Sequence, residues 1–168
     1  AHPDFEGLKR AHYQWLLNTR QEEGAGEIKE AEGDVVAAIS LYLKAGMPGR
    51  AAQAVAENPS GQYPSELLEN VAANLLFAGM HERAGRFFEE LGDERRAARA
   101  YREGRCYRQV VELCRRTSPE DVVSLEDEWA DWLMSQRHAD EAVSHYIEAG
   151  QSIKAIEAAL EARQWAKA

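Results

Sequence analysis

The sequence predicts an all-α protein, a right-handed solenoid of stacked antiparallel helix hairpins. Small residues recur at steps of 59 and then 58 residues along the chain. The aligned small residues are Ala25, Ala84 and Ala142; Gly33, Gly92 and Gly150; and Ala38, Ala97 and Ala155. Leu16, Leu75 and Leu133 follow the same steps. Because small residues at fixed steps mark close helix crossings, the pattern favours stacked helical units, which usually bind other proteins rather than catalyse reactions.

The first repeat is predicted at about residues 4–59. It opens with a long helix over residues 4–20, where Phe5, Leu8, Tyr13 and Leu16 keep near-helical spacing. Shorter helices are expected at about residues 22–32, 34–45 and 48–57. The loop that follows, at residues 58–63, contains proline and glycine and is the clearest break between repeats.

The second and third repeats are predicted at about residues 64–117 and 118–168. A long helix begins at Pro64, and Ser118 and Pro119 have the features of another helix start, with Asp121 placed to complete a capping box. The other expected helices span about 81–91, 93–103, 106–116, 119–136, 138–149 and 151–162. Residues 163–168 match the start of a helix in the second repeat. We therefore expect residues 1–168 to be one solenoid fragment that ends as a further helix begins.

The turns between short helices reuse one phrase. In the first repeat, Ala38 is followed by Tyr42, Gly46 and Arg50 at intervals of four residues. Glycine favours the left-handed conformation that ends a helix, and an alanine four residues before an aromatic places a small and a large side chain on one face. The phrase returns as Ala84, Phe88, Gly92 and Arg96, and as Ala142, Tyr146, Gly150 and Lys154. The predicted fold is therefore tetratricopeptide-like.

The charge of the chain argues against nucleic acid as a partner. The net charge of −9 argues against nucleic-acid binding, since lysine and arginine carry affinity for phosphate. The charge is uneven, at −3 over residues 1–59, +1 over 60–118 and −7 over 119–168. The longest apolar stretch, residues 71–80, is too short to span a bilayer, so no transmembrane segment is expected.

The two cysteines, Cys106 and Cys114, are predicted to stay unpaired. Eight residues on one helix separate them by about 12 Å, whereas a disulfide needs Cα atoms within about 7 Å. Two free thiols are typical of a reducing compartment.

No catalytic, cofactor or metal site is predicted. His81 and Glu82 begin a zinc-protease pattern, but Gly85 stands where the second histidine should be. His138 and His145 lack converging ligands and are interpreted as surface residues. The segment Gly24–Gly26 is interpreted as a tight helix crossing rather than part of a dinucleotide site. Trp15 and Trp132 share a repeat position, which favours core packing over a ligand cage.

Arg95, Arg99 and Arg102 depart from the repeat. At about 100° per residue they lie opposite Ala97 on one helix face. The equivalent residues are Val36, Ser40 and Leu43 in the first repeat and Ile153, Glu157 and Leu160 in the third. One interpretation is a solvated face with Glu94 and Glu103 as loose partners. The functional hypothesis is a docking patch for an acidic partner helix, or for the acidic third repeat of a second copy.

Two blocks of residues carry a resemblance to a known family. The segment from Tyr13 through Leu17 and Gln21 to Gly46, and the segment from Ser152 to Trp165, are similar to the largest subunit of intraflagellar transport complex B. The resemblance implies a non-enzymatic scaffold that contacts other complex B subunits in cilium assembly and transport. It also implies a location in the cilium or flagellum and at its base, on the cytoplasmic side. The alternative is a solenoid segment of a vesicle coat or tethering subunit.

Overall fold

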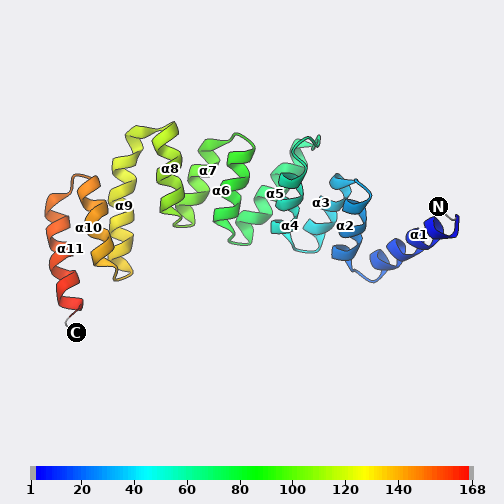
Figure 1. Cartoon of the computed structure of the whole chain (residues 1–168), viewed down its shortest axis with the longest axis horizontal. Helices are drawn as coiled ribbons and strands as arrows, with labels where there is room; N and C mark the ends of the chain where they lie inside the picture. The colour runs from blue at the N-terminus through cyan, green and yellow to red at the C-terminus, as the bar shows by residue number, and fades with distance from the viewer. Residues whose placement is uncertain (1–2, 167–168) are drawn as a thin grey trace. The chain divides into compact units, whose positions relative to one another are not determined.

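The computed structural model describes residues 3–166, which contain helices and turns but no β-strand. Contacts divide the chain into two compact units, Ala1–Asp93 and Glu94–Ala168. Within each unit, successive helices pack against their neighbours in the sequence and alternate in direction (Figure 1). This arrangement confirms the predicted all-α solenoid of antiparallel hairpins, while the division into three repeats stays a prediction.

The observed helices lie close to the predicted ones. The first unit holds α1 (Pro3–Asn18), α2 (Glu22–Ala31), α3 (Val35–Lys44), α4 (Pro48–Glu57), α5 (Ser65–Phe77) and α6 (His81–Glu90). The second unit holds α7 (Glu94–Glu103), α8 (Tyr107–Thr117), a 3₁₀ turn at Pro119–Asp121, α9 (Val122–Ser135), α10 (Ala139–Glu148) and α11 (Ser152–Trp165).

The repeated small residues lie where helices cross. Ala25 lies on α2, Ala84 on α6 and Ala142 on α10, and all three are fully buried. The crossing of α2 and α3 is so close that a Cβ added at Gly26 would meet the ring of Tyr42 at 2.7 Å. The prediction of a tight crossing at Gly24–Gly26 is therefore confirmed.

Left-handed backbone ends most of the helices. Gly33, Gly92 and Gly150 have φ angles of 84°, 76° and 72°, a region that L side chains rarely adopt. Arg20 and Arg137 take the same conformation at the ends of α1 and α9, one repeat step on either side of Gly79. The chain therefore turns at the same repeat positions even where glycine is absent.

A tyrosine, a carboxylate and a base form a repeated contact that joins neighbouring helices. The Tyr42 hydroxyl donates to Glu30 Oε2 at 2.6 Å, and Arg50 Nη2 reaches the same oxygen at 2.6 Å. In the second unit the Tyr146 hydroxyl donates to Asp131 Oδ1 at 2.6 Å, and Lys154 Nζ lies 3.3 Å from that oxygen. The Tyr and Arg or Lys positions of the turn phrase thus have a polar role beyond the packing predicted for them.

Three expectations are corrected. Residues 163–165 continue α11 instead of starting another helix, because Ala162 replaces Gly104 of the second repeat and nothing breaks the helix. Ser118 makes no side-chain cap, because a 3₁₀ turn precedes α9. Trp15 is 53% exposed rather than in the core, because the neighbouring Leu16 is the residue of α1 that packs into the core.

Candidate protein-interaction surfaces

The predicted arginine patch lies on one face of α7. Arg95, Arg99 and Arg102 are exposed, whereas Ala97 on the opposite face is fully buried. This face follows from the repeat. Because Ala97 and Ala100 are buried, the arginine positions on the opposite side of α7 are exposed to solvent.

The three arginines differ in how much of their charge is already paired. Arg99 Nε donates to Glu103 Oε1 at 2.9 Å, an exposed contact of the kind predicted, and the Arg99 side chain remains 80% exposed. Arg102 binds Glu128 of α9 through both Nη2 and Nε, at 2.7 and 3.3 Å. This ion pair was missed because Glu128 lies 26 residues away in sequence. Arg95 has no ion-pair partner among residues 3–166, so Arg95 and Arg99 carry most of the available positive charge.

A hollow of about 270 Å³ borders this arginine face. Arg99 and Arg102 of α7 stand on one side, and Asp121 and Ser124 stand near the start of α9. Its apolar lining comes from Ala98, Val110, Cys114 and Leu125. The arginine face therefore combines positive charge with an apolar recess, as partner surfaces often do.

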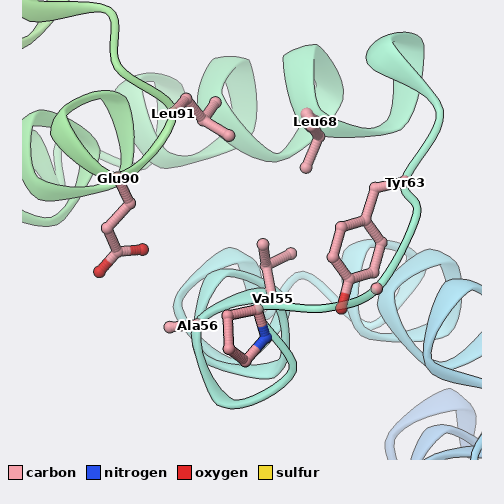
Figure 2. Close-up of a pocket in the computed structure, with 8 residues that line it drawn as sticks. Val55, Ala56, Tyr63, Leu68, Glu90 and Leu91 are labelled. Atoms are coloured by element: carbon pink, nitrogen blue, oxygen red, sulfur yellow. The ribbon is translucent and has the colours of Figure 1, made fainter.

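The first unit contains a second hollow, of about 560 Å³, between α4, α5 and α6. Figure 2 shows Tyr63 and Leu68 on one side of it and Glu90 on the other, with Val55 between them. Leu91 and Ala56 add to the lining. Glu90 is the one charged residue among those that line this hollow.

The loop before α5 forms one wall of this hollow and is held by hydrogen bonds. The Tyr63 hydroxyl donates to the carbonyl oxygen of Asn58 at 2.8 Å, and the Gly61 N–H donates to the same oxygen at 3.0 Å. A Cβ at Gly61 would lie 2.5 Å from the Tyr63 ring, so only glycine fits there without a shift. Burial raises the pKa of the Tyr63 phenol, which keeps the hydroxyl available as a donor.

Three polar residues occupy the corresponding place between α8, α9 and α10 of the second unit. Glu126 is only 3% exposed, and its Oε2 lies 2.7 Å from His145 Nδ1 while its Oε1 lies 3.3 Å from Arg115 Nη2. The His145 ring stacks on Trp129 with centroids 3.7 Å apart. His145 is thus half-buried and paired, which corrects its interpretation as a surface residue, whereas His138 is exposed.

The remaining residues considered for chemistry do not converge. Among residues 3–166, no group of three or more His, Cys, Asp or Glu side chains is placed to hold a metal ion. Cys106 and Cys114 are not joined by a disulfide, as predicted, and burial raises the pKa of the Cys114 thiol. No helix in the described part of the chain is long and apolar enough to cross a membrane.

Comparison with known proteins gives matches along the whole chain. It is 50% identical over 168 residues to the human protein named intraflagellar transport protein 172 homolog. Over 167 residues it is 46% identical to intraflagellar transport protein 172 of Chlamydomonas reinhardtii and 34% identical to intraflagellar transport protein osm-1 of Caenorhabditis elegans. These matches cover at least 99% of the chain but 10% of each relative. No protein-family model matches the chain.

Proposed function

Because this chain is homologous over its whole length to a segment of intraflagellar transport protein 172, we propose that it is a protein-binding scaffold segment of a complex B subunit. The relatives confirm the resemblance predicted from the sequence. Their names support a role in intraflagellar transport and a location in the cilium or flagellum. We further propose that the segment faces the cytoplasmic, reducing side, with which its two free thiols agree.

The arginine face carries this proposal. The buried alanines Ala97 and Ala100 hold α7 against its neighbours. Arg95 and Arg99 are therefore presented on a preformed surface, and little ordering is needed on binding. The partner we propose is an acidic helix of another complex B subunit. Because Arg102 is already bound to Glu128, its main role would be to form the edge of the hollow of about 270 Å³ beside the arginine face.

Reversing charge on this face tests the proposal. The Arg95→Glu/Arg99→Glu double variant should lose binding to at least one complex B subunit in a pull-down with the purified subunits. The matched control reverses Arg10 and Arg108, two exposed arginines on α1 and α8, and changes the net charge equally. Equal capture of every subunit by both variants and by the unmodified chain would refute the arginine face.

Two other roles give different results in the same assay. A vesicle-coat or tethering segment would capture coat subunits instead of complex B subunits. Self-association through the acidic third repeat would appear as a dimer in sedimentation, and the double variant would dissociate it.

A further inference from the structure

We infer that the hollow between α4, α5 and α6 binds an apolar side chain that stands next to a lysine or arginine in a partner protein. The inference rests on the proposed role as an interaction scaffold, but it uses a different unit and a different partner chemistry from the arginine face. Its lining residues come from α4, the loop before α5, α5 and the end of α6.

The hollow is apolar and preformed. Val55, Leu68 and Leu91 present hydrocarbon to it, and the bond from Tyr63 to the Asn58 carbonyl fixes the loop that forms its wall. Its volume of about 560 Å³ exceeds that of a single large side chain and lies in the range of ligand-binding clefts. An apolar group that enters it leaves water without reordering the loop.

The repeat does not require the apolar lining of this hollow. At the repeat positions of two lining residues, Ala56 and Leu68, the second unit carries Arg115 and Glu126. Arg115 Nη2 lies 3.3 Å from Glu126 Oε1, and Glu126 also pairs with His145 of α10. The same helix arrangement therefore carries polar, paired residues in the second unit and an apolar lining in the first.

The negative charge of Glu90 at the edge of the hollow favours a partner with a basic residue. Glu90 is exposed at the end of α6 and has no ion-pair partner among residues 3–166. Arg86, one turn earlier, binds Glu82 at 2.7 Å. An apolar recess with one unpaired carboxylate at its edge favours an apolar residue flanked by a base and disfavours the acidic helix proposed for α7.

A random dodecapeptide library displayed on phage tests this inference without using any transport subunit. Selection on the unmodified chain, with counter-selection on Ala56→Phe, should enrich peptides in which an apolar residue adjoins Lys or Arg. For a synthetic enriched peptide, Ala56→Phe should weaken binding at least about ten-fold by filling the recess. Glu90→Lys should weaken it about five-fold, the size of one exposed ion pair.

The repeat supplies matched controls. Glu148→Lys reverses the equivalent carboxylate at the end of α10, and Ala73→Phe adds the same ring at an exposed site on α5. Both should change affinity less than about two-fold. The inference fails if no peptide is enriched, if enriched peptides are acidic, or if the controls weaken binding as much. It also fails if Ala56→Phe converts a dimer of this chain into a monomer, because a second copy would then be the occupant.

The two experiments fail independently. Loss of complex B binding in the Arg95→Glu/Arg99→Glu variant says nothing about the peptide selection. Peptide binding that depends on Ala56 and Glu90 would stand even if the scaffold proved to serve another transport complex.

Discussion

At the scale of single residues, the buried tyrosines are the most informative side chains. Tyr42 is fully buried, and its hydroxyl donates to a carboxylate that Arg50 also binds. Burial, with the hydrogen bond to Glu30 as the next cause, raises the pKa of Tyr42 to about 12. The polar contact therefore ties α2, α3 and α4 together.

This contact makes stability depend on pH in a defined window. The unfolded tyrosine loses its proton near pH 10, whereas folded Tyr42 keeps it to about 12. The contribution of Tyr42 to the free energy of unfolding is thus complete below about pH 10 and is lost as the pH rises toward 12. Tyr42→Phe should lose about 1 to 2 kcal/mol at neutral pH. In urea unfolding, the difference between variant and parent should shrink above about pH 10.

Tyr13→Phe is the control for this prediction. The Tyr13 hydroxyl makes no hydrogen bond within the described residues, so its removal should change the unfolding free energy by less than about 0.5 kcal/mol. A Tyr42→Phe difference that stays constant from neutral pH to pH 12 would contradict the proposed hydrogen bond.

At the scale of elements, turn geometry decides where helices end. Gly33 has a φ of 84° and Gly7 lies within α1, and an added Cβ would meet nothing within 4 Å at either position. The two glycines therefore differ in backbone conformation and not in available space.

Replacing these two glycines by alanine should have opposite effects. Gly33→Ala should lower the unfolding free energy by about 1 kcal/mol, since alanine is strained at positive φ. Gly7→Ala should raise it by about 0.5 to 1 kcal/mol, because alanine is the better helix former. Thermal and urea unfolding of the two variants would measure this. Equal changes in unfolding free energy for the two variants would show that the positive φ at Gly33 does not require glycine.

Helix ends were predictable from sequence where a single residue controls them. The ends of α2, α3 and α6 follow from Gly33, Gly46 and Gly92. The repeat predicts that α11 ends at about residue 162, but Ala162 stands where the second repeat has Gly104, and the helix continues to Trp165. Helix length there depends on local propensity rather than on the repeat.

At the scale of the whole molecule, net charge sets which partners approach. The total of −9 repels polyanions, while Arg95 and Arg99 attract acids only at short range. We expect no gel shift of a DNA duplex at protein concentrations up to about 0.1 mM in about 0.15 M salt. A shift that the Arg95→Glu/Arg99→Glu variant abolished would show that the local charge outweighs the total.

The sequence predicts the all-α fold, the approximate helix bounds, the buried small residues and the exposed arginine face. Each of these depends on residues close together in the chain or on a regular repeat, so periodicity and turn chemistry suffice to predict it. The side chains that meet across helices are known only from the three-dimensional arrangement. Arg102 pairs with Glu128, Glu126 is buried against His145, and a hollow lies beside Val55 and Leu68. Such contacts depend on which side chains from different helices meet, and neither the helical period nor the turn residues specify that.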